Sequence, residues 1–539
     1  MPIPRHGSTP PSRKQRRAGA SRKRGAGRRV VEADDLPDLQ KARGLWQAKR
    51  FPEALDLFER TVRKHPNNLM ALTDTARAFG ARYEVDKAEA YLGRMLNLAP
   101  EDAVVQMQAG QSYRMIYRPD KAIACLQQAV ALMPNLMEAR LELAILLERR
   151  GQLAEALEHV DAIRKNHEYP AEVEVIGGRL SRRLKDREQA IQQLSTVIDS
   201  DDVFWSTRQH AGMELARAYD GQGDYDAAAE VAQRAKGFAL PHVEAAVSPR
   251  DLALQEAWEY VCDNISRDHF TRWADAMRDV PKRRVALLSG PPRSGTTLLE
   301  NILDAHPDLV SSDERDAFPR YIHGKMLADA KPEETAIELL ERQTVPTIVG
   351  MRERYLGFMQ SALGEKIGDR LHLDKNPSIS PLIPGVLRLF PECKIILALR
   401  DPRDVVLSCY MTHMPLNSQS APYLDFKSAA EHYVKTMRAW LALREQLDPE
   451  QYLEVRYEDV VADTESQARR ALAFLDLPWD DGVLRFQEHV AGKQVDSPTY
   501  EQVGQPIYTS SIGRWKQYER HMAPALDILQ PMVATLGYD

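Results

Sequence analysis

The chain has 539 residues, of which 43% are hydrophobic and 28% charged. These proportions are ordinary for a globular protein, and the length exceeds what one hydrophobic core supports. No run of 18 or more apolar residues occurs, so we expect no membrane-spanning helix. The four cysteines are scattered without CxxC spacing, which argues against a disulfide framework or a zinc site and favours reduced thiols in the cytoplasm.

The first segment, residues 1–34, is strongly basic, although the whole chain carries a net charge of −6. Residues 1–29 hold ten basic side chains and no acid, so removing them leaves −16 for the remainder. With almost no large apolar residues, this segment is predicted to be a disordered tail. Weak contact with nucleic acid or anionic lipid is the alternative. A secretory signal is not expected, because no apolar stretch follows the charges.

Residues 35–242 show a repeat of 34 residues. Small residues recur at this period, and another small residue precedes each by twelve positions. The first set is Ala54, Ala88, Ala122, Ala156 and Ala190; the second is Ala42, Ala76, Gly110, Ala144 and Gly178. A sixth unit centres on Ala228, after an insertion. Small residues let two antiparallel helices pack closely, and Pro66, Pro100 and Pro134 end the second helix of their units.

This pattern resembles the tetratricopeptide repeat, and about six copies are predicted. The resemblance implies an all-α solenoid of helical hairpins. Stacked repeats offer a groove for a polypeptide acceptor or a partner protein. We interpret the small residues themselves as packing residues. Residues 243–282 have amphipathic helical spacing and are predicted to be a helical connector.

From residue 283 to residue 539, short apolar runs alternate with helical patterns. We predict strands in "RVALLSG", "RLHLD", "KIILALR" and "QYLEVRY". Such alternation is typical of an α/β domain with a parallel sheet. Polar clusters follow the predicted strands: "SGPPRSGTT", "DKNP", "RDPRDVVLS" and "RYED". Ligands bind at the carboxyl ends of parallel strands, so these clusters predict one shared site.

The loop after the first strand is similar to a phosphate-binding P-loop. Four residues separate Gly290 from Gly295, but Thr296 occupies the place of the P-loop lysine. Backbone N–H groups after a strand and at a helix start bind anions, and Arg293 adds a fixed positive charge. No acid at the end of a strand is an evident metal ligand. The sequence therefore predicts an anion site without a metal.

"GPPRSGTTLLENILDAHPDLVSSDE" together with "KIILALRDPRDVVLS" resembles the sulfotransferases that use 3′-phosphoadenylyl sulfate (PAPS). The likeness is greatest to the tyrosylprotein sulfotransferases, which share P-R-S-G-T-T followed by L-D-A-H-P and an acid. It covers roughly residues 284–520. The fold class is thus a multidomain chain: a helical-hairpin solenoid, then a P-loop-like parallel-sheet sulfotransferase domain at 283–539.

The resemblance implies a role for each matching residue. Glu314 would be the general base, with Arg293 and Lys375 stabilising charge in the transition state. The 5′-phosphosulfate would be held by Arg293, Ser294, Gly295, Thr296 and Thr297, and the 3′-phosphate by Arg400 and Ser408. Tyr457 would lie near the nucleotide. "SSIGRWKQY" resembles a late loop that would cover the cofactor, in which Arg514, and more weakly Ser511, would contact a phosphate. His306 is interpreted as structural.

One departure concerns the acceptor. Family members with a tyrosine acceptor have an arginine two residues after the catalytic glutamate, where this chain has Asp316. Those relatives are also membrane proteins of the secretory pathway. A protein tyrosine remains the leading acceptor, and a carbohydrate or lipid hydroxyl is the alternative. A homodimer is compatible with the sequence.

Three functions are compatible with these sequence features. The first is sulfuryl transfer from PAPS. The second is a P-loop kinase or nucleotidase, which the missing lysine disfavours. The third is an interaction scaffold, in which the repeats bind partners and the α/β domain is catalytically inactive. The intact anion-site residues disfavour this third function. Each residue also has a structural reading; Glu314, for instance, could be an acid at a helix start.

Overall fold

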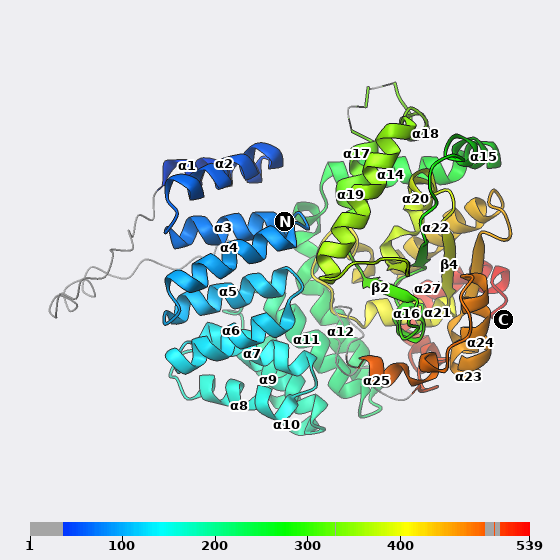
Figure 1. Cartoon of the computed structure of the whole chain (residues 1–539). Helices are drawn as coiled ribbons and strands as arrows, with labels where there is room; N and C mark the ends of the chain where they lie inside the picture. Colours follow the sequence, from blue (N-terminus) through cyan, green and yellow to red (C-terminus); the bar gives the residue numbers. More distant parts are fainter. Residues whose placement is uncertain (1–35, 329, 332, 491–500, 502–506) are drawn as a thin grey trace. The chain divides into compact units, whose positions relative to one another are not determined.

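The computed structural model describes residues 36–539, except 329, 332, 491–500 and 502–506. The predicted basic tail, residues 1–34, lies outside the described residues. The described chain divides into two compact units, of which the first ends at Glu142 and the second begins at Leu143. Figure 1 identifies their elements.

The first unit is built from pairs of antiparallel helices. Its helices are α1 (Pro37–Gln47), α2 (Phe51–Lys64), α3 (Leu69–Gly80), α4 (Val85–Leu98), α5 (Ala103–Met115) and α6 (Pro119–Leu132). The repeating small residues lie where paired helices touch. A Cβ on Gly110 of α5 would come within 2.7 Å of Leu126 Cγ on α6. Close packing of the pair therefore explains the small residue.

The second unit continues the helix pairs, after helix α7 (Met137–Arg149), in which the boundary falls. They are α8 (Leu153–Arg164), α9 (Glu172–Arg183), α10 (Arg187–Asp199), α11 (Trp205–Asp220) and α12 (Tyr225–Ala239). Gly178 repeats the geometry of Gly110, since its Cβ would lie 2.5 Å from Leu194 Cγ. The connector is helical as predicted, with α13 (Val243–Ala246), α14 (Pro249–Asn264) and α15 (Arg267–Ala276).

A parallel sheet of five strands follows, in the order β2-β3-β1-β4-β5. The strands are β1 (Val285–Ser289), β2 (Leu309–Asp313), β3 (Leu371–Lys375), β4 (Lys394–Leu399) and β5 (Tyr452–Arg456). The four predicted strands are present. The sequence analysis missed β2, whose buried serines hide its strand character: Ser312 Oγ lies 3.0 Å from His372 Nε2, and Ser311 Oγ donates to Glu300.

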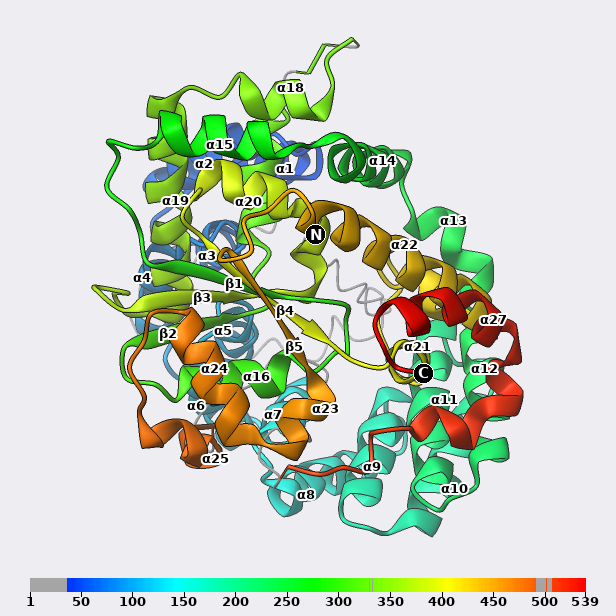
Figure 2. The same cartoon turned by 90° about the vertical axis from the view of Figure 1, so that its right-hand side faces the viewer.

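Helices cover both faces of this sheet, as Figure 2 shows. On one face lie α16 (Thr296–Asp304), α23 (Tyr457–Ala462) and α24 (Thr464–Phe474); on the other lie α20 (Ile383–Leu389) and α22 (Phe426–Arg444). Leu288, Leu373 and Ile396 pack against Leu299 and Leu472 in the core of the first face. The remaining helices are α17 (Gly324–Met326), α18 (Ala336–Glu341), α19 (Val345–Leu363), α21 (Pro402–Tyr410), α25 (Phe486–Val490) and α27 (Glu519–Thr535).

The predicted fold class is confirmed: helical hairpins come first and a parallel-sheet α/β domain follows. All four cysteines are free and buried. In the part of the chain that the structure describes, no helix is both long and apolar enough to cross a membrane.

Candidate active site

The carboxyl ends of the strands open onto a cavity of about 640 Å³ within the second unit. Its size is typical of a small-molecule site. Most of the predicted site residues line it: Arg293, Gly295, Thr296, Thr297, Glu314, Arg400, Ser408, Tyr457 and Arg514. Parallel strands end at one edge of a sheet, which explains how residues far apart in sequence meet here.

The loop after β1 needs both of its glycines. Gly290 has φ 144°, and a Cβ there would lie 2.4 Å from the carbonyl oxygen of Ala398. Gly295 has φ 96°, and its Cβ would lie 2.6 Å from Tyr457 Cδ2. Only glycine fits both the left-handed backbone and the close contacts. The loop can therefore turn sharply and bring its backbone to the cavity.

Helix α16 starts at the cavity, because Gly295, Thr296 and Thr297 all line it. The first N–H groups of a helix have no partner within the helix, and they attract anions. Ser294 is fully buried beneath the loop, and its Oγ has no partner among the described residues. The start of α16 thus presents backbone N–H groups to the cavity, next to the buried Ser294 hydroxyl.

Arg293, Arg400 and Ser408 form one connected group. Arg293 Nε donates to Ser408 Oγ at 2.9 Å, and Arg400 Nη1 donates to the carbonyl oxygen of Arg293 at 3.1 Å. Arg400 is almost wholly buried, and its Nε has no partner among the described residues. Burial lowers the pKa of Arg293 to about 10, and the positive charges of Arg217 and Arg400 add to this effect. A buried pair of guanidinium groups is a strong site for an anion.

A late loop closes over this group, as predicted. Arg400 Nη2 donates to the carbonyl oxygen of Ser511 at 2.6 Å, and the hydroxyl groups of Tyr457 and Ser511 lie 2.7 Å apart. Asp404 of α21 anchors the loop by accepting from the backbone N–H groups of Gly513 and Trp515, at 2.7 and 2.8 Å. The sequence analysis did not identify Asp404.

Arg514 lines the cavity, but its guanidinium is already engaged. It forms an ion pair with Asp220, the last residue of α11, and Asp220 also accepts from the hydroxyl group of Tyr518. The predicted contact between Arg514 and a phosphate therefore stays a prediction. Asp220 belongs to the repeat region, so a residue of the helix pairs helps to fix this loop.

Glu314 follows β2 and lies at the edge of the cavity with about a third of its side chain exposed. Its φ of 45° is unusual for a residue other than glycine, and its N–H donates to the carbonyl oxygen of Lys375 at 2.8 Å. Its position at a strand end contradicts the alternative of an acid at a helix start.

Lys375 is fully buried and does not line the cavity. Its ammonium contacts three carboxylates: Glu314 Oε1 at 2.9 Å, Glu300 Oε2 at 3.3 Å, and Asp313. Burial alone would lower the pKa of Lys375, but these carboxylates raise it above its usual value. Lys375 therefore stays charged and holds Glu314, while its role in stabilising charge in the transition state stays a prediction. No sequence signal pointed to Glu300 or Asp313.

Asp316, the position that departs from the tyrosine-specific relatives, pairs with Arg320 at 2.5 Å. His306 is structural, as interpreted: its Nε2 lies 2.9 Å from the carbonyl oxygen of Pro478. No group of three His, Cys, Asp or Glu side chains is placed to hold a metal within the described ranges.

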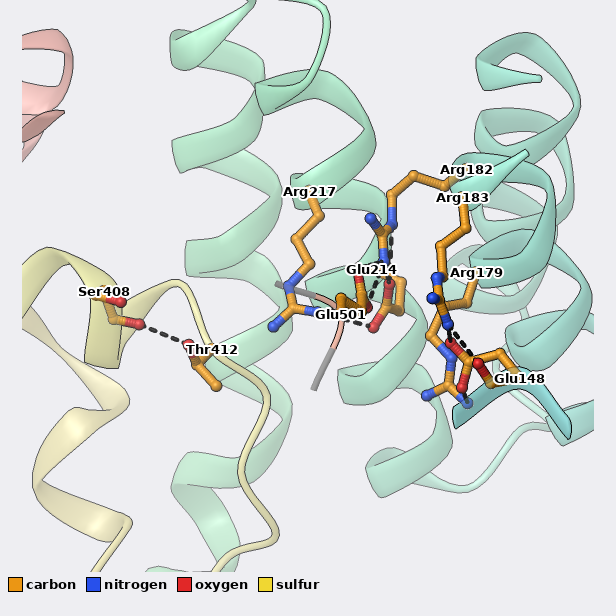
Figure 3. A network of polar contacts seen from close by, with 9 residues as sticks. All are labelled: Glu148, Arg179, Arg182, Arg183, Glu214, Arg217, Ser408, Thr412 and Glu501. Atoms are coloured by element: carbon orange, nitrogen blue, oxygen red, sulfur yellow. Dashed lines mark hydrogen bonds and ion pairs between the residues drawn. The ribbon is translucent and has the colours of Figure 1, made fainter. Parts of the chain in front are cut away.

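The repeat region supplies part of the cavity wall, which the sequence did not predict. Arg182 of α9 and Arg217 of α11 line the cavity. Both contact Glu501 and Glu214, as Figure 3 shows. The 34-residue pattern marked only packing positions, so charged residues between them carried no signal.

Residues 286–481 match the family model described as "Sulfotransferase family". This part of the chain is a sulfotransferase domain. Residues 39–103, 108–171 and 178–242 match the model described as "Tetratricopeptide repeat", so repeats precede the sulfotransferase domain.

Several known proteins are similar to this chain. An uncharacterized protein of Aquifex aeolicus (strain VF5) is 26% identical over 64% of this chain and 44% of its own length. Protein-tyrosine sulfotransferase A of Caenorhabditis elegans is 29% identical over 47% of this chain and 66% of its own length. A solved sulfotransferase domain from the curacin biosynthetic pathway is 21% identical over 47% of this chain and 98% of that domain, with a TM-score of 0.34. The chain thus spans between about half and two thirds of the first two relatives.

Proposed function

We propose that this chain transfers a sulfuryl group from PAPS to an acceptor hydroxyl. One observation carries the proposal: the loop after β1, the Arg400–Ser408 group and Glu314 converge on one cavity in a sulfotransferase domain. The first two are anion sites, as a nucleotide with two anionic ends requires. The third is a carboxylate that can take a proton from a hydroxyl group.

The residues present fit PAPS. Gly295 lets the loop bring its backbone to the cavity, and buried Arg400 Nε and Ser294 Oγ are unsatisfied within the described part of the chain. Unpartnered buried polar atoms are costly unless a ligand engages them. When bound, PAPS supplies the activated sulfuryl group. We assign its 5′ end to residues 293–297 and its 3′-phosphate to Arg400 and Ser408, beside Tyr457.

Glu314 is the proposed general base. Its side chain lies at the cavity and is about a third exposed, so its carboxylate can reach an acceptor hydroxyl. Lys375 contacts it from the buried side at 2.9 Å and orients it. Arg293 and the N–H groups of α16 stabilise charge that develops on the donor side. Glu314 thus acts on the acceptor side of the transferred sulfuryl group, and Arg293 acts on the donor side.

The proposed acceptor is a tyrosine of a polypeptide, docked with the help of the repeats. Relatives named as protein-tyrosine sulfotransferases support this choice, as do the repeats. Asp316 favours a second candidate, a carbohydrate or lipid hydroxyl, because it replaces the arginine of the tyrosine-specific relatives and faces Arg320.

A labelled-sulfate assay tests both the reaction and the acceptor. Lysate incubated with the full-length chain and labelled PAPS should yield a labelled product that mass spectrometry identifies as a sulfated peptide. A labelled glycan or lipid would support the proposed sulfotransferase activity but show that the acceptor is not a protein tyrosine. Absence of any labelled product, with PAPS intact, would contradict the proposed reaction and favour the scaffold alternative.

A further inference from the structure

One face of helix α11, in the last repeat, forms a wall of the cavity. His210, Glu214, Arg217 and Gly221 recur at three- or four-residue intervals, so they share this face. Arg217, Asp220 and Gly221 line the cavity, and two turns earlier His210 stacks on His413 with ring centroids 4.3 Å apart. Helix α11 therefore runs along the part of the domain that follows α21.

The same repeat holds the end of α21, the helix that carries Ser408. Lys236 of α12 is buried and donates to the carbonyl oxygen of Thr412 at 3.2 Å. Thr412 Oγ1 in turn donates to the carbonyl oxygen of Ser408 at 2.6 Å, a contact drawn in Figure 3. The last repeat thus contacts the segment that carries the proposed 3′-phosphate site.

The charged groups on this wall are unevenly satisfied. Arg182 binds Glu501 at 2.8 and 3.0 Å and Glu214 at 3.1 Å. Arg217 reaches the same two carboxylates only through Nη1, at the long distances of 3.4 Å to Glu214 and 3.5 Å to Glu501. Glu214 and Glu501 are therefore engaged mainly by Arg182. Arg217 keeps a quarter of its side chain exposed at the cavity.

Arg217 also lies near Arg293, which contacts Ser408. The positive charge of Arg217 contributes, after burial, to the lowered pKa of Arg293. Two positive groups that face one half-buried cavity repel each other, and an anion bound between them relieves that repulsion. The proposed function places the 3′-phosphate on Arg400 and Ser408, and Arg293 contacts both residues although its own loop is assigned to the 5′ end.

We propose that Arg217, supplied by the last repeat, is a further ligand of the 3′-phosphate of the donor nucleotide. This inference rests on the proposed function. It makes the repeat region part of the nucleotide site, in addition to any role in docking an acceptor. It also gives the site a guanidinium that the sulfotransferase domain does not encode.

Calorimetric titration of the full-length chain with two nucleotides tests the inference. The probes are 3′-phosphoadenosine 5′-phosphate (PAP) and adenosine 5′-phosphate (AMP), which lacks the 3′-phosphate. We expect Arg217→Gln to weaken PAP binding by about 10- to 100-fold, the range for a lost hydrogen bond to a charged group, and to change AMP binding less than about threefold. Arg208→Gln, on the same helix but paired with Asp201 outside the cavity lining, should change neither.

A second variant covers the case in which Arg217→Gln fails to fold. Glu501→Gln removes a carboxylate that competes for Arg217, so PAP binding should tighten by about threefold or more while AMP binding stays constant. If the wild type prefers PAP over AMP and both variants keep that preference unchanged, the inference is wrong and the proposed function stands. If the wild type shows no preference for PAP, the proposed function fails and the inference fails with it.

Discussion

At the scale of single residues, the environment of Lys375 decides what Glu314 can do. One buried ammonium faces three carboxylates, of which only Glu314 reaches the cavity. Glu300 and Asp313 are buried on the protein side, so they orient Lys375 and cannot contact a ligand in the cavity. Chemistry at this edge of the cavity therefore depends on one carboxylate.

Substituting Glu314→Gln should lower the turnover number for sulfate transfer by at least about 100-fold, because general-base catalysis contributes factors of about 10² to 10⁴. PAP affinity should change less than about threefold, since Glu314 does not belong to either anion site. Steady-state kinetics and calorimetry provide the two readouts. Glu365→Gln is the control, because this exposed residue pairs with Arg370 outside the cavity lining. Near-normal turnover of the glutamine variant would show that another group is the base.

At the scale of elements, the sequence predicted the parts of the site that follow local rules. The loop at Gly290–Thr297 and the Arg400–Ser408 pair lie where strand ends and glycine positions placed them. β2 was missed because Ser311 and Ser312 are polar, and they are buried only because Glu300 and His372 bond them. The roles of Asp220 and Arg217 were missed because tertiary packing brings α11 to the cavity. No local pattern records such packing.

Helix α11 fixes the late loop through Asp220, which pairs with Arg514 and accepts from Tyr518. Asp220→Asn should weaken PAP binding by about tenfold, because the loop that carries Ser511 then loses a charged anchor worth about 1 to 2 kcal/mol. The turnover number at saturating PAPS should change less than about threefold. Asp226→Asn is the matched control: it removes exposed pairs with Arg520 and His521, outside the loop. Equal PAP affinity in both variants would contradict the anchoring role.

At the scale of the molecule, the later repeats and the sulfotransferase domain share one compact unit. Contacts join them along α9, α11 and α12, through Arg182, Asp220 and Lys236. The domain boundaries that the sequence predicts, after residues 242 and 282, stay a prediction. Because these repeats contribute to the cavity wall, we expect substitutions in them to affect both stability and ligand binding.

The stability of this unit should depend on Asp374. Burial raises the pKa of Asp374 to about 6, against the opposing effects of the Tyr355 hydroxyl at 2.6 Å and of Lys375. Between about pH 4 and pH 6 the folded state therefore keeps a proton that the unfolded chain has released. Stability falls as the pH rises through this window, by about 3 kcal/mol for two pKa units.

Asp374→Asn should remove this loss of folding stability at higher pH. The amide stays neutral, and its oxygen can still accept a hydrogen bond from Tyr355. The apparent Tm of this variant should exceed the wild-type value by about 3 to 5 °C at pH 8 and match it near pH 4. Differential scanning calorimetry over this pH range provides the measurement. Asp369→Asn, at an exposed position nearby, should follow the wild-type curve. A constant difference at every pH would show that ionisation of Asp374 is not the cause.

The central claim is that this cavity performs sulfuryl transfer from PAPS. Its most direct test is transfer of labelled sulfate from PAPS to a tyrosine peptide by the purified full-length chain, with ATP and Mg²⁺ as the competing donor system. The account predicts a sulfated peptide with PAPS and no phosphorylated peptide or ATP hydrolysis with ATP and Mg²⁺. Hydrolysis of ATP without any reaction of PAPS would contradict it and identify a nucleotidase.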